Sequence, residues 1–289
     1  MFDRRSLTPW TPWLFMAPAL LLFAGYVVWP IAQSIWLSLH AWDGLGAKTW
    51  VGVDNYAEMW EDEQIATAVY NNIWWLVCYL LAPVMGLALA LFLNQQVRGI
   101  RLAKSLFFFP FVINLVVVGL VFRWFYDPSY GPLNALLGVF DIAPTSFLAD
   151  EDTATFSVIA AGLWPQTAYC MLIYLAGLAG MDGEVLEAAR IDGARGARML
   201  RHVILPQLRP ATFIVVVVTV VGALRSFDLI AIMTEGGPYG TSTVLAWEMY
   251  EQALFSYRMG YGAAIAVLLF IVMDFYIAWF LWRLARRER

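Results

Sequence analysis

The sequence predicts an all-α integral membrane protein with six transmembrane helices and both termini in the cytoplasm. Hydrophobic residues make up 61% of its 289 residues and charged residues only 14%, with a mean hydropathy of +0.67. This composition is too apolar for an ordinary soluble domain. Six apolar segments are each near the ~20 residues that a spanning helix needs. Lysine and arginine lie almost entirely in alternate loops.

The first apolar segment runs from about 13 to 37, after a short polar head at 1–12. A signal peptide has an apolar region of only ~7–15 residues, whereas this segment is long enough for a hydrocarbon core of ~30 Å. We therefore expect it to be retained as a span. The other expected spans cover about 73–93, 105–125, 156–178, 211–232 and 261–282, and a basic cytoplasmic tail follows at 283–289.

Basic residues set the orientation. The head, the 94–104 loop, the 181–210 loop and the tail hold most of them, whereas the alternate loops contain only Lys48 and Arg258. Because basic loops stay in the cytoplasm, we expect the 181–210 loop and both ends there. The outer loops are acidic and rich in aromatic residues, most of them expected as interfacial anchors, and cover about 38–70, 126–155 and 233–260.

One polar stretch, 182–206, lies between the fourth and fifth spans and predicts two short helices separated by a glycine. Asp182 is placed to cap the first helix by accepting from free backbone N–H groups. Gly193 is expected to form the break, since a residue without Cβ adopts the φ values of a sharp corner. Pro206 is expected to end the second helix.

The order of residues in this stretch resembles the EAA signature of ABC importer permeases, EAA-x3-G-x9-I-x-L-P. Here it is Glu187-Ala188-Ala189, three residues, Gly193, nine residues, then Val203, one residue and Leu205-Pro206. Val203 replaces the usual isoleucine. The resemblance implies a cytoplasmic coupling helix that docks in a groove of an ATPase subunit. The coupling residues it implies are Glu187, Ala188, Ala189, Asp192, Gly193, Leu205 and Pro206.

The last outer loop narrows the resemblance. It contains a Gly-Gly-Pro turn at 236–238, then a possible helix from about Thr243 to Phe255. Together with the phrase IYLAGL at 173–178, this is similar to the maltose and glycerol-phosphate group of these permeases. The resemblance implies a bacterial inner-membrane protein that works with a second homologous permease, two ATP-binding subunits and an extracytoplasmic solute-binding protein, and that translocates a sugar or sugar derivative.

No residues of catalysis are evident. The chain has no G-x-x-x-x-G-K-[ST] run for ATP phosphates, so ATP and Mg are expected on the partner ATPase. Hydrolase motifs are also missing, and we expect no enzyme. His40 and His202 are far apart with no Cys or His cluster nearby, so we expect no metal site. No basic block suggests nucleic acid.

Sugar recognition needs aromatic faces that stack on the ring, and amide or carboxylate groups that bind hydroxyls. Seven residues in the third, fourth and fifth spans offer this chemistry, although polar groups in spans often only join helices. The tentative substrate residues are Asn114, Trp164, Gln166, Tyr169, Ser226, Phe227 and Asp228.

Four charges within or near spans leave alternatives open, because a charge in lipid must be paired or hydrated. Arg123 is expected to reach the outer interface. Arg225 and Asp228 either pair on one helix or line a substrate path. Asp274, midway in the sixth span, is expected to pair structurally, whereas a self-contained secondary transporter would depend on it. The outer loops contain few basic residues, and this scarcity favours a neutral glycoside as the solute. Glycerol 3-phosphate stays the alternative solute.

Overall fold

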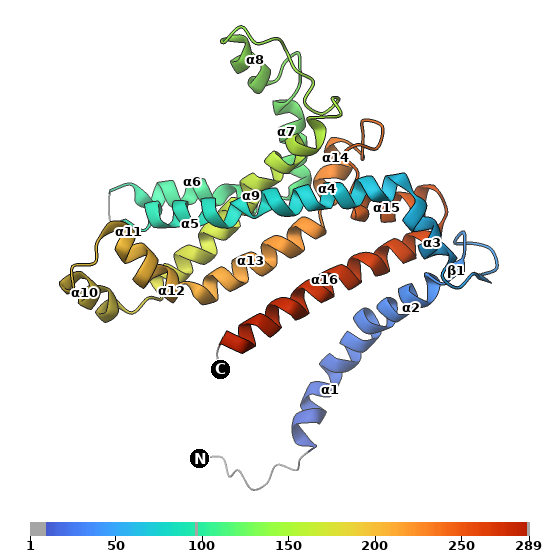
Figure 1. The fold of residues 1–289 in the computed structure, drawn as a ribbon, viewed down its shortest axis with the longest axis horizontal. Coiled ribbons are helices and arrows are strands. Elements are labelled where there is room, and N and C mark those ends of the chain that lie inside the picture. Colours follow the sequence, from blue (N-terminus) through green and yellow to red (C-terminus); the bar gives the residue numbers. More distant parts are fainter. Residues whose placement is uncertain (1–9, 96–97, 288–289) are drawn as a thin grey trace. The chain divides into compact units, whose positions relative to one another are not determined.

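The structure is a computed structural model that describes residues 10–95 and 98–287, drawn in Figure 1. The chain divides into two compact units. Unit 1 comprises Met1–Glu61 and Met249–Ile271, and unit 2 comprises Asp62–Glu248 and Val272–Arg289. The part of the predicted polar head before residue 10 and the last two residues of the tail lie outside the described residues.

Unit 1 begins with one helical run and a small ribbon. The run consists of α1 (Thr11–Phe23), a π-helical turn η1 (Ala24–Val28) and α2 (Trp29–Leu37). The strands β1 (His40–Ala41) and β2 (Thr49–Trp50) pair antiparallel, His40 opposite Trp50. This ribbon is a small exception to the predicted all-α fold. Helix α3 (Asp54–Glu61) follows, and a π-helical turn η3 (Glu251–Phe255) precedes α16 (Met259–Arg287), which continues into unit 2.

Unit 2 contains most of the helices. In chain order they are α4 (Glu63–Tyr79), α5 (Leu81–Leu93), α6 (Ile100–Val112), α7 (Leu115–Phe125), α8 (Pro132–Gly138), α9 (Ala154–Ala179), α10 (Gly183–Ile191), α11 (Gly196–Met199), the π-helical turn η2 (Leu200–Ile204), α12 (Leu205–Gln207), α13 (Arg209–Leu224), α14 (Asp228–Met233) and α15 (Leu245–Tyr250).

Within the described residues, four helical runs are long and apolar enough to cross a membrane. They are Pro12–Leu37, Glu63–Leu93, Ala154–Ala179 and Met259–Phe280. Two more apolar helix pairs are bent: α6 and α7 by 100°, and Gly196–Gln207 and α13 by 74°. The number of spans reaches the predicted six if each bent pair counts as one.

Two expected spans are broken by residues that hydropathy does not detect. At 105–125 the helix stops at Val112, because Ile113 and Asn114 take extended backbone and the Asn114 side chain caps α7 by accepting from the Val116 N–H at 2.8 Å. At 211–232, α13 ends at Leu224, and three non-helical residues precede α14. A uniformly apolar sequence hides both breaks from hydropathy.

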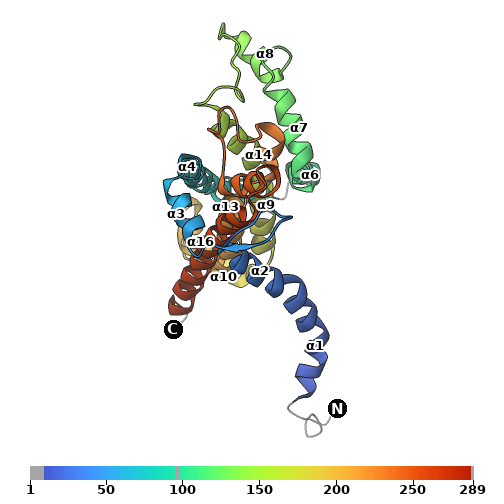
Figure 2. The same ribbon diagram turned by 90° about the vertical axis from the view of Figure 1, so that its right-hand side faces the viewer.

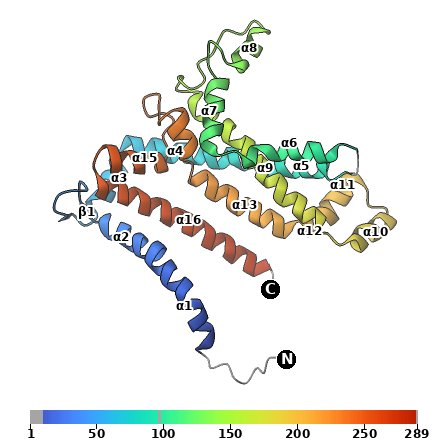
Figure 3. The same cartoon turned by 180° about the vertical axis from the view of Figure 1, so that it is seen from behind.

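Helix α9 is the centre of unit 2, where α4, α5, α6, α7, α13 and α14 all pack against it. Figure 3 shows α5, α6 and α13 running beside α9, and Figure 2 shows α7 next to α14. The tightest crossing is with α5, which presents Ala82, Gly86 and Ala90 at four-residue spacing. Ala82 and Ala90 are fully buried. Small residues at this spacing let backbones approach closely in a membrane, where burial gives little driving force between helices.

The Gly-Gly-Pro loop is held by two asparagines of α4. Asn71 Nδ2 donates to the carbonyls of Thr241 at 2.7 Å and Thr243 at 2.8 Å. Asn72 Oδ1 accepts from the Leu245 N–H at 3.0 Å, just where α15 begins. The predicted helix from Thr243 to Phe255 is therefore present, but it begins two residues later and ends as the π-helical turn.

We expect Gly86→Ala to lower the melting temperature of the purified protein by about 5 °C, because overpacking typically costs about 1–3 kcal/mol. A Cβ at Gly86 would lie 2.5 Å from Cys170 Cβ and 2.8 Å from the Met171 nitrogen. The control is Gly25→Ala, where a Cβ would meet nothing within 4 Å. Equal melting temperatures of the two variants in a detergent unfolding assay would contradict the tight crossing.

Candidate functional site

The polar stretch 182–206 forms the predicted pair of short helices at one end of unit 2 (Figure 3). Helix α10 begins at Gly183 because the Asp182 side chain accepts from the Glu184 N–H at 2.9 Å, as the sequence predicts. Glu184 adds a negative charge in the first turn, where the helix dipole favours it. The start of α10 is thus fixed by local chemistry.

The break between the helices is a Schellman cap centred on Gly193. Gly193 has φ +83°, its N–H donates to the Arg190 carbonyl at 3.1 Å, and the Ala194 N–H donates to the Ala189 carbonyl at 2.9 Å. These two bonds define the motif, and the left-handed residue at its centre is most often glycine. The three residues between Glu187-Ala188-Ala189 and Gly193 therefore lead from the middle of α10 to its C-terminal cap.

The second helix does not end at Pro206, so that expectation is wrong. The helical run from Gly196 continues to Gln207, and a π-helical turn at 200–204 precedes the proline. The Leu205 N–H donates to the Leu200 carbonyl, five residues back. Proline lacks an N–H and its ring collides with the carbonyl four residues earlier, and the wider turn accommodates both effects. The same arrangement precedes Pro30, where Trp29 N–H donates to the Ala24 carbonyl.

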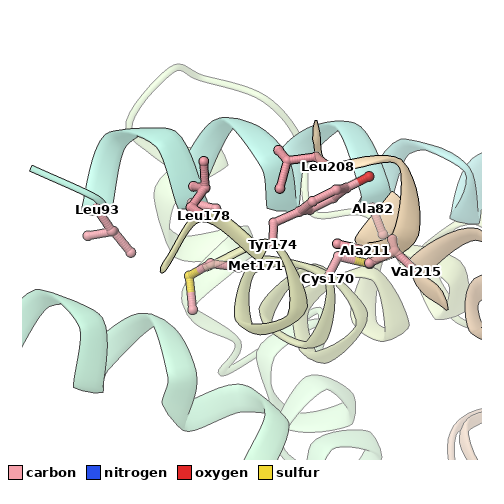
Figure 4. Close-up of a cluster of buried hydrophobic side chains, with 10 residues drawn as sticks. Ala82, Leu93, Cys170, Met171, Tyr174, Leu178, Leu208, Ala211 and Val215 are labelled. Carbon is pink, nitrogen blue, oxygen red and sulfur yellow. The ribbon is translucent and has the colours of Figure 1, made fainter. Parts of the chain in front are cut away.

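Leu208 anchors this segment in the core of unit 2. It is fully buried at the 74° corner between α12 and α13. A Cβ on Gly177 of α9 would lie 2.8 Å from Leu208 Cδ2, so the helix backbone and the leucine are in close contact. Figure 4 shows Leu208 beside Tyr174 and Ala82, among the buried side chains of α5, α9 and α13. The corner after α12 therefore packs against all three helices.

The expected coupling residues divide by exposure. Glu187, Ala188, Asp192 and Gly193 are exposed, whereas Ala189, Leu205 and Pro206 are half-buried.

Sequence reasoning missed two exposed apolar residues of α10. Val185 is 45% exposed and Ile191 is 87% exposed. Together with Ala188 they recur every three residues, a spacing that places them along one side of a helix. That spacing was readable in the sequence, but their exposure was not. Helix α10 thus presents an uncovered apolar edge, with Glu187 next to it in the sequence.

The three tentative substrate residues of α9 face three different neighbours. The Trp164 ring lies 5.8 Å from Phe122 of α7, and the Tyr169 ring lies 5.5 Å from Phe111 of α6. Gln166 Nε2 donates to Thr219 Oγ1 of α13 at 2.9 Å. At about 100° per residue, these positions are spread around the helix. The structure therefore gives each of them a helix-joining contact.

The remaining four lie at the two breaks in the bundle. Asn114 is exposed at the bend between α6 and α7, where it caps α7. Ser226 is buried and its hydroxyl donates to the Ala223 carbonyl at 2.8 Å. The Phe227 ring stacks on Trp247, 6.0 Å between centroids. Asp228 is exposed in the first turn of α14. Of the seven, Asn114 and Asp228 keep exposed polar side chains.

The charged residues of the spans behave differently from one another. Arg123 Nη1 donates to the Ile232 carbonyl at 3.3 Å, a structural contact. Arg225 and Asp228, both in the described part of the chain, form no ion pair, and a non-helical turn separates them. The expectation that they lie on one helix is therefore wrong. Asp274 is exposed on α16.

Comparison with known proteins gives consistent matches. Residues 82–289 match the family model described as "Binding-protein-dependent transport system inner membrane component". The chain is 35% identical over 285 residues to a probable ABC transporter permease protein of Pyrococcus horikoshii, covering 96% of both chains. It is 34% identical over 279 residues to the alpha-glucoside transport system permease protein AglF of Rhizobium meliloti, covering 93% of this chain and 80% of that protein.

Among solved structures, the fold is similar to a chain in the crystal structure of a bacterial alginate ABC transporter in complex with an alginate pentasaccharide-bound periplasmic protein. The TM-score is 0.83 at 20% identity, covering 94% of this chain and 92% of that chain. At this identity the likeness shows a shared fold.

We expect Gly193→Ala to accelerate hydrogen exchange at the Ala194 amide about tenfold, because an alanine in the left-handed region costs about 1–2 kcal/mol. The cost is in the backbone, since a Cβ at Gly193 would meet nothing within 4 Å. Gly183→Ala is the matched control, with equal space and no positive φ. If both variants exchange at the wild-type rate, the cap does not depend on glycine.

The Gln166–Thr219 hydrogen bond predicts a double-mutant coupling energy of about 0.6 kcal/mol, the average for such bonds between membrane helices. The measurement is the unfolding free energy of Gln166→Leu, Thr219→Val and the double variant. If the two changes in unfolding free energy add up to that of the double variant, Gln166 does not join the helices, and its role as a solute ligand is favoured.

Proposed function

Because the chain belongs to the binding-protein-dependent transport system inner membrane component family, and is a non-catalytic ABC importer permease subunit of the inner membrane, we propose that it translocates a sugar or sugar-derived solute by alternating access. Residues 182–206 couple this movement to ATP hydrolysis on a partner. Alternating access by rocking of helix bundles around a central site is the general behaviour of transporters with helical bundles.

The observation that carries the coupling proposal is the uncovered apolar edge of α10. Val185, Ala188 and Ile191 are exposed on a helix that the Asp182 and Gly193 caps keep short and rigid. Such an edge fits a hydrophobic groove in the mode by which amphipathic helices are bound. Movement of the groove reaches the spans through α12, because Leu208 is buried among α5, α9 and α13.

The proposed assembly contains a second homologous permease, two ATP-binding subunits and a solute-binding protein outside the membrane. ATP and Mg bind to the ATPase partners, since this chain has no phosphate-binding loop. The alginate transporter of similar fold was crystallised with its periplasmic protein, which supports the last of these partners. Both termini of this chain are then cytoplasmic.

The solute is proposed to be a neutral glycoside. Six of the seven tentative substrate residues are uncharged, and Asp228 is acidic, a set that suits hydroxyl groups better than a phosphate. The relative from Rhizobium meliloti is named for alpha-glucoside transport. A glycerol phosphate is the alternative, favoured by Arg225, which is exposed and without an ion pair in the described residues.

A secondary transporter that uses Asp274 is a less supported alternative. Asp274 is exposed on α16, and it is the single carboxylate within the apolar part of that helix, without a second one to form a relay. In the importer, its neighbour is the companion permease or water. Transport by the chain alone, lost in Asp274→Asn, would support the secondary transporter.

The test is affinity purification of the chain from its native membrane, with ATPase activity measured on the eluate with and without candidate sugars and the binding protein. We expect a second permease and an ATPase to elute with it. Elution of the chain alone, with transport retained in vesicles, would overturn the importer.

Glu187→Gln should lower binding-protein-stimulated ATPase activity of the assembly by about tenfold or more, because a charge at a docked interface loses its partner. Glu184→Gln is the control, since it removes the same charge from the same helix outside the EAA pattern. Equal activities of the two variants would remove Glu187 from the coupling contact.

A further inference from the structure

Unit 1 contains a hollow of about 370 Å³ that the proposed function does not use. Three chain segments line it: the residues after β1, helix α3, and the residues before and at the start of α16. The lining residues that matter here are Trp42, Asp43, Asp54, Asn55, Glu58, Tyr257 and Arg258. All of them lie in the predicted loops 38–70 and 233–260, which the distribution of basic residues places on the outer side of the membrane.

The charges of the hollow are unbalanced. Arg258 Nη2 donates to both carboxylate oxygens of Glu58 at 2.5 Å, and its guanidinium lies 4.3 Å from the centre of the Tyr261 ring. That pair leaves Asp43 and Asp54, which form no ion pair within the described residues. The N–H groups of Gly46 and Leu45 hold the pKa of Asp43 below its usual value, so this carboxylate is charged at neutral pH.

The amide oxygen of Asn55 adds to this excess. Asn55 is only 7% exposed, and its Nδ2 donates to the carbonyls of Ser38 at 2.8 Å and His40 at 3.1 Å. No described residue donates to its Oδ1, and this oxygen is not among the solvent-excluded atoms. The hollow therefore offers two unpaired carboxylates and one free amide oxygen to a ligand that is positive and rich in donors.

The lining of the hollow favours an organic cation over a metal ion. No group of three or more His, Cys, Asp or Glu among the described residues is close enough to hold a metal. Tyr257 adds an aromatic ring to the lining, and aromatic rings attract ammonium and guanidinium groups. The Trp42 ring already has such a contact, because the Lys48 ammonium lies 4.5 Å from its centre. Lysine and arginine side chains combine this charge with several donors.

We propose that this hollow receives a lysine or arginine side chain of the solute-binding protein when that protein docks on the outer face. The inference rests on the proposed function, which supplies the partner. A protein is favoured over a free cation because the alginate transporter of similar fold was crystallised in complex with its periplasmic protein.

The experiment measures the dissociation constant of the binding protein for the assembled transporter in nanodiscs, as a function of NaCl concentration. The variant is Asp43→Asn with Asp54→Asn, since asparagine keeps the acceptor that Leu45 and Gly46 use. We expect the dissociation constant to rise about tenfold at low salt. The difference should vanish near 1 M NaCl, where the Debye length is ~3 Å.

The matched control is Glu151→Gln with Asp152→Asn, which removes two charges from another exposed outer loop. We expect its dissociation constant to stay within about twofold of wild type. An equal loss of affinity in both double variants would mean that the effect of charge is diffuse. Wild-type affinity in the Asp43 and Asp54 double variant would mean that the hollow is not used. Either outcome overturns the proposal.

Charge reversal provides a second measurement. Asp54→Lys should weaken binding further, and a lysine or arginine of the binding protein changed to glutamate should restore it. Failure of every surface lysine and arginine to restore binding would also overturn the proposal. If instead the wild-type assembly binds no solute-binding protein at all, the proposed function itself has failed, which this design separates from failure of the hollow.

Discussion

The close approach of α5 and α9 is the contact on which the rest of unit 2 depends. Gly86 faces Cys170 and Met171 with no room for a Cβ, and Ala82 and Ala90 extend the contact by one turn each way. Since helices in lipid gain little from leaving it, packing at this distance provides the attraction. Helix α9 is then held as the axis against which α4, α6, α7, α13 and α14 pack.

This arrangement makes the corner at Leu208 mechanically important. Leu208 lies against Gly177 of α9, and the cluster around it includes Ala82 of α5 and Val215 of α13. Three helices therefore meet one residue that lies just after the polar stretch 182–206. Within that stretch, caps at both ends of α10 keep this helix in a defined shape. A protein interior is close-packed and transmits displacement, so the proposed movement of the coupling segment would reach the bundle at this corner.

The parts of this structure that the sequence predicts are those with a local cause. Hydropathy predicts the spans, Asp182 predicts a helix start, and Gly193 predicts a helix end, because each effect acts within one turn. The bend at Asn114 was not predictable in this way: apolar residues on both sides conceal it, and only the side-chain bond to Val116 identifies it. The stripe of Ala82, Gly86 and Ala90 was visible, but its partner on α9 was not. The three tentative ligands of α9 shared a chemistry in the sequence, yet the helix turns them toward separate neighbours.

The π-helical turn before Pro206 gives a geometric meaning to the fixed number of residues between Gly193 and Val203. That turn adds one residue to the run from Gly196 to Gln207 without adding a full step of α-helical rotation. A deletion there would remove the wide turn, and each residue of an α-helix changes direction by about 100°. The number of residues in this segment therefore fixes the direction in which α10 points, relative to the anchored Leu208. A single insertion or deletion would keep every residue of α10 and change the direction in which its apolar edge points.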